Sequence, residues 1–312
     1  MHFTIPALTA LAVLSATLAP SAALAWTRPG HMVSAAIAYD ELAARDPEAL
    51  KQILAIIAQH PDRGAFEVAA GRATGEDRDR RIFMQIARWP DDVRGGGHDH
   101  PTWHYAQGPV VDRANPPPRP PPQDRIGAAL EAFALNARVA GDPAAPAADR
   151  AVALCWVFHL LGDIHQPLHT AQLFSRDFPA GDRGGGLQYV RDPQTGDAIS
   201  LHWLWDDSVH RLGDPEPAFA RSRVLQTRLP RAVFPELTKA TLIEDFPAWG
   251  EESYRLAAPL TYRSDMIAAR SAAEARPLPS AYLKDATAVA ERRLTLAGYR
   301  LGDVASALMR PR

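Results

Sequence analysis

The sequence predicts an all-α fold, a single mainly helical domain with long loops and at most a short hairpin. Apolar residues recur three and four positions apart, strong helix formers (Ala, Leu, Arg, Glu) fill the same segments, and β-branched alternation is scarce. The segments with this period are His31–Ala44, Pro47–Gln59, Arg78–Ala87, Asp124–Val139, Asp149–Leu161, Trp249–Leu256 and Ala281–Leu308.

Glycine and proline clusters separate these segments. The breaks fall at Gly95–Gly97, Pro116–Pro122, Gly141–Pro146 and Gly181–Gly186. Gln188–Val190 is compatible with a short strand in a hairpin before Leu201. The chain has no internal repeat, and the proline run has the length of a surface loop. We therefore expect one domain over residues 26–312.

Residues 1–25 have the features of a signal peptide. Ile5–Leu18 is apolar, and Ala23–Ala25 supplies small residues for cleavage after Ala25. An uncleaved anchor is the weaker alternative, because the run is short and Pro20 interrupts it. No later segment is apolar enough to span a membrane. We expect a periplasmic or secreted protein that begins at Trp26.

The net charge and the cysteine content limit the kinds of binding surface and covalent cross-link that the protein can have. The formal net charge is −2, so no broad basic surface for nucleic-acid phosphates is indicated. If the protein handles phosphates, bound cations must supply most of the local positive charge. Cys155 is the single cysteine, which excludes an internal disulfide and is expected to be a small buried residue.

The strongest local pattern is a cluster of histidines and aspartates at the end of an apolar helix. His159 and Asp163 are four residues apart and share one helical face, and Pro167 then turns the chain so that His169 can return to the same region. His202 and Asp206 repeat the four-residue spacing. One such pair arises readily by chance, but two pairs with His169 favour a metal site.

Several other residues are candidates for the metal site, but their sequence context supports this role less strongly. Asp91 and His104 lie beside tryptophans, where a helix cap and an aromatic core are the structural alternatives. His98 and His100 are rival ligands in a glycine-rich loop, where rigid support is lacking. His165 is expected to orient a ligand rather than to bind metal.

In combination, these motifs resemble the S1/P1 nuclease family, zinc enzymes related in fold to bacterial zinc phospholipase C. The match rests on His159–His169 (HxxGDxHQPLH) followed by Leu201–Asp206 (LHxxWD). Trp26–His31, Trp89–Arg94 and Trp103–Tyr105 are similar to further family motifs. The resemblance covers nearly the whole chain after residue 25.

The resemblance implies three zinc ions, and every ligand position carries the expected residue type. The implied sets are Asp91, His104, His159 and Asp163 for one ion, the α-amino and carbonyl groups of Trp26 with His31 and Asp163 for a second, and His169, His202 and Asp206 for a third. Asp163 would bridge two ions. Because Trp26 must supply a free amino group, signal cleavage becomes a condition of activity.

The implied activity is hydrolysis of phosphodiester bonds by metal-activated water. Asp91, Asp163 and Arg94 are the expected catalytic residues, with Arg94 helping to neutralise phosphate charge. Tyr105 stands where family members carry a base-stacking aromatic, and burial in the core is its structural alternative. The expected substrates are single-stranded DNA or RNA, cut to 5′-phosphorylated products, with 3′-nucleotidase activity as an addition. We expect a monomer without a stable protein partner.

The sequence also departs from the family pattern. Gly186 stands where the family commonly has asparagine, and the stretch from Leu173 to Gly181 is longer than usual. These loops border the expected cleft, so the sequence predicts metal binding more firmly than it predicts substrate preference. A zinc phospholipase C-like hydrolase and a non-catalytic zinc-binding protein therefore stay as alternatives.

Overall fold

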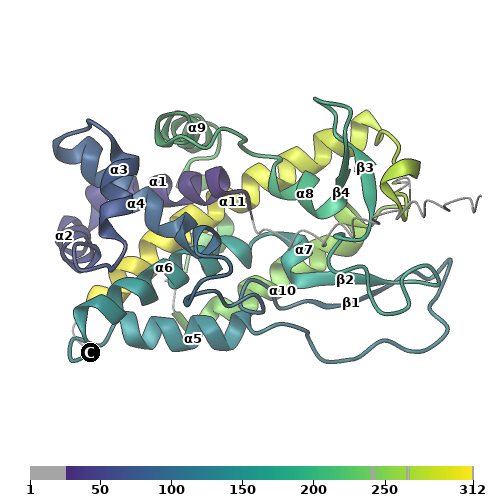
Figure 1. Cartoon of the computed structure of the whole chain (residues 1–312), viewed down its shortest axis with the longest axis horizontal. Helices are drawn as coiled ribbons and strands as arrows, with labels where there is room; N and C mark the ends of the chain where they lie inside the picture. Colours follow the sequence, from purple (N-terminus) through teal and green to yellow (C-terminus); the bar gives the residue numbers. More distant parts are fainter. Residues whose placement is uncertain (1–25, 240–242, 265, 267, 311–312) are drawn as a thin grey trace, which may run out of the picture.

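A long C-terminal helix organises the fold. The computed structural model describes residues 26–239, 243–264, 266 and 268–310, so the expected signal peptide lies outside the described residues. Helix α11 (Ser280–Met309) crosses the molecule and packs on α1 (Arg28–Arg45) (Figure 1). The two helices meet at Gly298, where a Cβ would lie only 2.6 Å from Cβ of Ile37. Glycine therefore permits this close crossing.

Each predicted helical segment contains a helix, and the mainly helical single domain is confirmed. The predicted start at Asp124 is wrong, because residues 124–128 are not helical and Gly127 has φ +107°. The remaining α-helices are α2 (Pro47–Ile57), α3 (Arg63–Ala70), α4 (Gly75–Asp92), α5 (Ala129–Ala140), α6 (Ala147–Asp163), α7 (Pro167–Thr170), α8 (Leu201–Asp206), α9 (Pro215–Arg228) and α10 (Phe246–Leu256). Short 3-10 turns and one π-helical turn, Ala257–Thr261, connect them. Helices α3, α7, α8 and α9 lie outside the predicted helical segments.

Helix α4 extends beyond the predicted end at Ala87. It continues through Pro90 to Asp92. Pro90 has no N–H for the carbonyl of Ile86, so the helical ladder is interrupted within this last turn. The extension places Asp91 on a helix that also supplies the carbonyl of Ala87 to the site described below.

Two short strand pairs lie at one end of the molecule (Figure 1). The predicted hairpin is present, with β3 (Tyr189–Arg191) antiparallel to β4 (Ala198–Ser200). A second pair exceeds the expectation of at most one hairpin: β1 (Gly108–Val111) runs parallel to β2 (Ala171–Phe174). Strand β1 is four residues long and begins Gly-Pro, so it carries no alternation from which a strand is predicted.

The interior has two hydrophobic clusters. The main core is formed by helices α1–α6, α9, α10 and the C-terminal part of α11. The minor core lies under α8 and the hairpin and consists of Leu168, Val190, Leu201, Leu204, Trp205, Leu278, Tyr282 and Ala286. The single cysteine, Cys155, is buried in the main core as expected.

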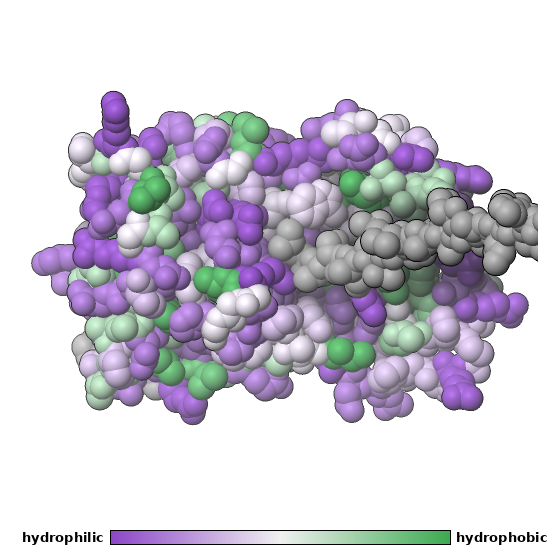
Figure 2. All heavy atoms as spheres, viewed as in Figure 1, coloured by the Kyte–Doolittle hydropathy of each residue, from purple (hydrophilic) through white to green (hydrophobic). Residues whose placement is uncertain are grey.

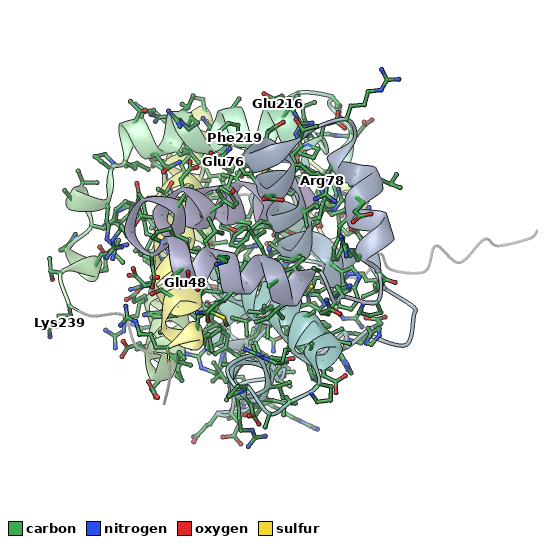
Figure 3. The ribbon with its side chains drawn as sticks, turned by 90° about the vertical axis from the view of Figure 1, so that its left-hand side faces the viewer. Glu48, Glu76, Arg78, Glu216, Phe219 and Lys239 are labelled. Carbon is green, nitrogen blue, oxygen red and sulfur yellow. The ribbon has the colours of Figure 1, made fainter. Side chains whose placement is uncertain are left out.

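The surface is mainly polar. Apolar residues are scattered among hydrophilic ones over the face in Figure 2. At the end of the molecule shown in Figure 3, charged side chains of both signs lie outward, including Glu76, Arg78 and Glu216. Several are paired, as Arg81 is with Glu216 at 2.8 Å. Within the described part of the chain, no helix has both the length and the hydrophobicity that crossing a membrane requires.

Candidate metal centre

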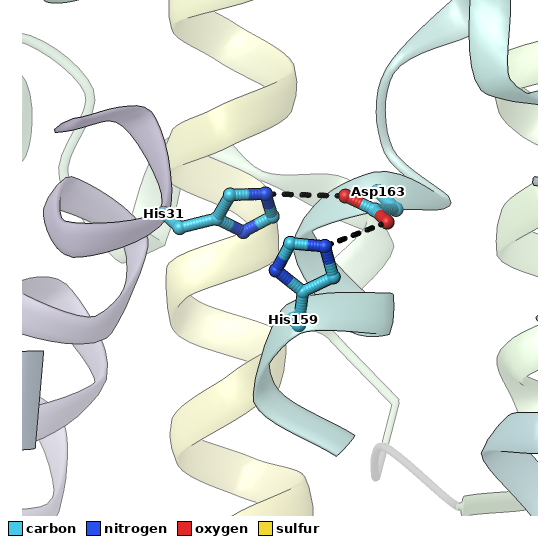
Figure 4. A group of neighbouring side chains, drawn as sticks. All are labelled: His31, His159 and Asp163. Carbon is cyan, nitrogen blue, oxygen red and sulfur yellow. Dashed lines mark ion pairs between the residues drawn. The ribbon is translucent and has the colours of Figure 1, made fainter. Parts of the chain in front are cut away.

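The centre begins where α1 and α6 face each other. His159 and Asp163 stand one turn apart on α6, and their Nε2 and Oδ2 atoms are 3.2 Å apart. His31 of α1 approaches the other carboxylate oxygen, with Nε2 3.2 Å from Oδ1 (Figure 4). The rings of His31 and His159 stack at 3.9 Å between centroids. All three side chains are fully buried.

Asp91 and His104 complete this group from α4 and the segment before β1. His104 Nδ1 lies 3.3 Å from Asp163 Oδ2 and 2.8 Å from His159 Nε2. Asp91 Oδ1 lies 3.9 Å from His159 Nε2 and accepts a hydrogen bond from Arg94 Nη2 at 2.9 Å. We call His31, Asp91, His104, His159 and Asp163 the first ligand cluster. Asp163 is central to it, with one oxygen toward His31 and the other toward His104 and His159.

A second ligand cluster consists of His169 on α7 with His202 and Asp206 on α8. The two Nε2 atoms of the histidines are 3.1 Å apart. Asp206 Oδ2 lies 3.3 Å from His202 Nε2, and Oδ1 lies 3.9 Å from His169 Nε2. These side chains are buried and their donor atoms converge closely enough to surround one cation.

Backbone carbonyls set the orientation of three of the histidines. Nδ1 of His159 lies 2.8 Å from the carbonyl of Ala87, Nδ1 of His169 lies 2.6 Å from that of His104, and Nδ1 of His202 lies 2.7 Å from that of Gly184. A carbonyl oxygen only accepts, so each Nδ1 carries a hydrogen, and Nε2 is the ring nitrogen that remains to bind a cation. This is the usual support of a metal-binding histidine.

The buried donors fit a metal ion in both clusters. In the second cluster, two Nε2 lone pairs face each other at 3.1 Å, which is repulsive without a cation between them. Both oxygens of Asp163, Oδ2 of Asp91 and Oδ2 of Asp206 are buried without a well-directed hydrogen-bond donor among the described residues. Buried carboxylates without donors are costly unless a cation compensates them. Imidazole and carboxylate are donors that zinc accepts.

The two carboxylates at the centres of the clusters differ electrostatically. Burial acts to raise the pKa of Asp163, but His159 and the neighbouring His104 and His31 outweigh it and hold that pKa well below its usual range. Burial raises the pKa of Asp206 well above its usual value, and the nearby Asp163 and Asp91 act in the same direction. The histidines of the first cluster therefore stabilise the carboxylate form of Asp163, whereas the neighbours Asp163 and Asp91 disfavour the carboxylate form of Asp206.

Trp26 lies between the clusters. Its indole Nε1 donates to the carbonyl of Gly162 at 2.9 Å, beside Asp163. The next residue, Thr27, donates its backbone N–H to the carbonyl of Asp206 at 3.2 Å. These two hydrogen bonds tie Trp26 and Thr27 to α6 and α8, next to Asp163 and Asp206.

The remaining predicted residues fall around these clusters. Tyr105 is half-buried, and Gly127, where a Cβ would lie 2.4 Å from Tyr105 Cδ2, leaves room for its ring. The rings of His100 and Trp103 stack with their centroids 3.8 Å apart, and the ring of His98 lies beside that of Trp89. Both rival histidines therefore pack against tryptophan rings. Neither belongs to a metal-capable group among the described residues.

His165 does not orient a ligand side chain, contrary to expectation. Its Nδ1 lies 2.7 Å from the carbonyl of Leu161 and its Nε2 lies 2.9 Å from Arg300. Burial and the charges of Arg293 and Arg300 lower its pKa well below the usual value. His165 is therefore a neutral part of a buried arginine network.

Sequence reasoning missed the residues that support the second cluster. Asp182 accepts hydrogen bonds from the backbone of Leu173 and Gly185 at 2.8 and 2.9 Å and from Gln188 at 2.6 Å. This fixes the loop that presents Gly184 to His202. Gly186, at the family's asparagine position, lies in the same loop and donates its N–H to the carbonyl of Arg183. In the sequence, the run of glycines from Gly184 to Gly186 was the feature that could have indicated this loop.

Comparison with known proteins agrees with this geometry. Residues 26–310 match the family model described as S1/P1 Nuclease. Endonuclease 4 of Arabidopsis thaliana is 31% identical over 162 residues, and Endonuclease 3 of the same plant is 30% identical over 160 residues; each alignment covers 48% of both chains. The chain thus spans about half the length of these curated relatives. Because the family match extends over almost the entire described chain, the protein belongs to the S1/P1 nuclease family.

Proposed function

We propose that this protein is a zinc-dependent phosphodiesterase that cuts single-stranded DNA and RNA endonucleolytically and leaves 5′-phosphorylated products. The observation that carries the proposal is the pair of buried ligand clusters, whose eight residues are each at most 2% exposed. Their nitrogen and oxygen donors match the preference of zinc. Family membership and the similarity to two plant endonucleases support nucleic acid as the substrate.

The residues of the first cluster would hold two ions through the shared Asp163. Its oxygens face different histidines, at 3.2 Å from His31 and 3.3 Å from His104. When bound, zinc supplies Lewis acidity and lowers the pKa of a water molecule toward neutrality. Within the protein, His159 is fixed by the carbonyl of Ala87, so little reorganisation is needed during the reaction.

Arg94 is the cationic side chain that bonds to the carboxylate of Asp91 in this cluster. Its Nη2 and Nε atoms lie 2.9 and 3.2 Å from Oδ1 of Asp91, and its side chain is 19% exposed. It therefore holds Asp91 in place and brings positive charge to the solvent-facing edge of the cluster. We assign it the neutralisation of phosphate charge, and we assign Tyr105 the stacking of a base.

Export and cleavage after Ala25 belong to the same proposal. The family match begins at Trp26, the residue that cleavage would expose. A free α-amino group is a better metal ligand than a peptide nitrogen, because the peptide nitrogen has no available lone pair. The active protein would be a periplasmic or secreted monomer. A precursor that retains residues 1–25 is expected to bind fewer ions than the cleaved chain.

Parallel assays on the cleaved protein test the substrate. Single-stranded DNA, single-stranded RNA, a 3′-mononucleotide and phosphatidylcholine vesicles are incubated with zinc-loaded protein. The proposal expects 5′-phosphorylated fragments from the single strands, with release of phosphate from the mononucleotide as the 3′-nucleotidase activity. Lipid hydrolysis without cleavage of nucleic acid would assign the protein to the phospholipase C-like alternative. Zinc binding without hydrolysis of any substrate would leave a non-catalytic zinc-binding protein.

A further inference from the structure

The corner between α6 and α7 joins the two ligand clusters. Residues 164–166 run from Asp163, the shared carboxylate of the first cluster, to the short helix that carries His169. His165 and Gln166 are completely buried in this corner. The side-chain oxygen and nitrogen of a buried glutamine both need hydrogen-bond partners, so the partners of Gln166 show how its amide is oriented.

The partners of Gln166 fix the direction of its amide. The N–H of Leu168 can only donate, so the oxygen of the Gln166 side chain must face it, at 2.5 Å. The amide nitrogen then faces Asp206 and donates to Oδ1 at 2.7 Å. The α6–α7 corner is thereby bonded directly to a ligand of the second cluster.

This bond selects which oxygen of Asp206 is directed to the histidines. Oδ1 is engaged by Gln166 and lies 3.9 Å from His169 Nε2. Oδ2 is buried without a directed donor among the described residues and lies 3.3 Å from His202 Nε2. A carboxylate held in this way has little freedom to rotate away from a cation between the histidines.

The corner itself has rigid support from α10 and α11. The carbonyl of Ile164 accepts from Ser253 Oγ at 2.6 Å, and that of His165 accepts from Arg293 Nε at 3.2 Å. Arg300 donates to His165 Nε2 at 2.9 Å. Glu252 pairs with both arginines, at 2.9 and 2.8 Å. The backbone that leads into Gln166 is therefore anchored by two buried arginines and the partly exposed Glu252, a support that a side chain positioning a ligand requires.

We propose that Gln166 is a positioning residue that fixes Asp206 and thereby sets the affinity of the second ligand cluster for its ion. It is not a ligand, and it acts through the orientation of the carboxylate. The inference rests on the proposed function only in taking zinc as the ion. It assigns a role to one residue between the clusters, whereas the proposed function concerns the reaction.

The test replaces Gln166 by methionine, which has similar size and no amide. Zinc per chain is measured by mass spectrometry during titration with a chelator, and cobalt(II) replaces zinc for visible spectra of the sites. We expect one of three ions to bind about 10–100-fold more weakly, the usual effect of losing an outer hydrogen bond. The other two ions should keep their affinity, and only one cobalt(II) component of the spectrum should change.

Gln85→Met is the matched control. Gln85 is also a buried glutamine, 4% exposed, but its amide contacts Met32 in the main core and no ligand. It should keep wild-type metal affinity. Gln166→Glu is a second variant, which retains an acceptor for Leu168 N–H but places an acceptor against Asp206, so it should weaken the same ion at least as much as methionine does.

Three outcomes separate the interpretations. Wild-type affinity for all ions in both Gln166 variants would overturn the inference. Equal weakening of all three ions would overturn it too, because a general structural role predicts that result. A wild-type protein that binds three ions and cleaves no single strand would refute the proposed function and leave the role of Gln166 intact, since its readout is metal affinity.

Discussion

The two ligand clusters are built on different supports. The first takes His31, Asp91, His159 and Asp163 from long helices that form the main core. The second takes its residues from α7 and α8, helices of four and six residues beside the minor core. Long packed helices hold ligands through their own backbone, whereas short helices depend on outside contacts. The second cluster should therefore be the more sensitive to changes in its surroundings.

The loop around Gly184 and the side chain of Gln166 supply these outside contacts. Gly184 provides the carbonyl for His202, and Gln166 provides a donor for Asp206. In the first cluster the corresponding carbonyl, that of Ala87, belongs to helix α4. The comparison predicts that variants fall into two classes, which differ in the number of ions lost.

The largest effect is expected at the shared carboxylate. Asp163→Asn removes one negative charge from between three histidines, so two ions should be released together. Activity on single-stranded DNA should fall by about 10³-fold or more, equivalent to at least about 4 kcal/mol. Steady-state assays and metal analysis of the same sample measure both effects. Retained activity with three ions would show that Asp163 does not bridge.

Asp206→Asn should have a smaller and separable effect. Only the ion of the second cluster should be lost, because Asp206 approaches His169 and His202 alone among the described ligands. A fall of about 10²-fold in kcat is expected, the size seen when one stabilising group of a transition state is removed. Release of all ions would contradict the independence of the two clusters.

Backbone support of the second cluster can be tested without changing a ligand. Gly184 has φ +60°, and an added Cβ would lie 2.4 Å from the carbonyl oxygen of Leu168. Gly184→Ala should cost about 2–4 kcal/mol of stability and weaken one ion.

Gly196→Ala is its control. Gly196 has φ +77° with nothing within 4 Å of a Cβ, so this variant should lose only about 1–2 kcal/mol and keep all ions. Denaturant unfolding followed by metal analysis compares the two variants. Equal metal affinity in both would show that the loop does not support His202.

The smallest effect is expected at Tyr105. Loss of its ring in Tyr105→Ala should raise KM for single strands by an amount worth about 1–3 kcal/mol and leave metal content unchanged. Tyr105→Phe keeps the ring and should behave like the wild type. If Tyr105→Ala loses metal instead, the ring serves to pack His104 and not to bind a base.

Local spacing predicted one pair of residues in each ligand cluster, His159 with Asp163 and His202 with Asp206. His159 and Asp163 lie on a strongly periodic helix, so their common face followed from spacing alone. The approach of His31 and His104 depends on packing between segments far apart in the chain, and only the family resemblance indicated it. Long helices were predicted for the same reason, since their period repeats over several turns.

The parts that escaped prediction depend on contacts without local pattern. The β1–β2 pair forms between residues 108–111 and 171–174, and neither segment alternates. Gln166 belongs to the HxxGDxHQPLH motif, but the sequence does not reveal its bonding partner, and Asp182 stands in no locally periodic pattern. Their functions appear only when the structure brings their partners to within 3 Å. The sequence neighbours of His165 predict a role in ligand orientation, but its side chain contacts the carbonyl of Leu161 on α6 and Arg300 on α11.

Metal analysis of the cleaved wild-type protein, alongside Asp206→Asn and Asp163→Asn, tests the two-cluster account most directly. Each protein is purified, loaded with zinc, freed of excess metal and analysed by native mass spectrometry. The account predicts three zinc ions in the wild type, two in Asp206→Asn and at most one in Asp163→Asn. Fewer than two ions in the wild type, or identical losses in the two variants, would contradict it.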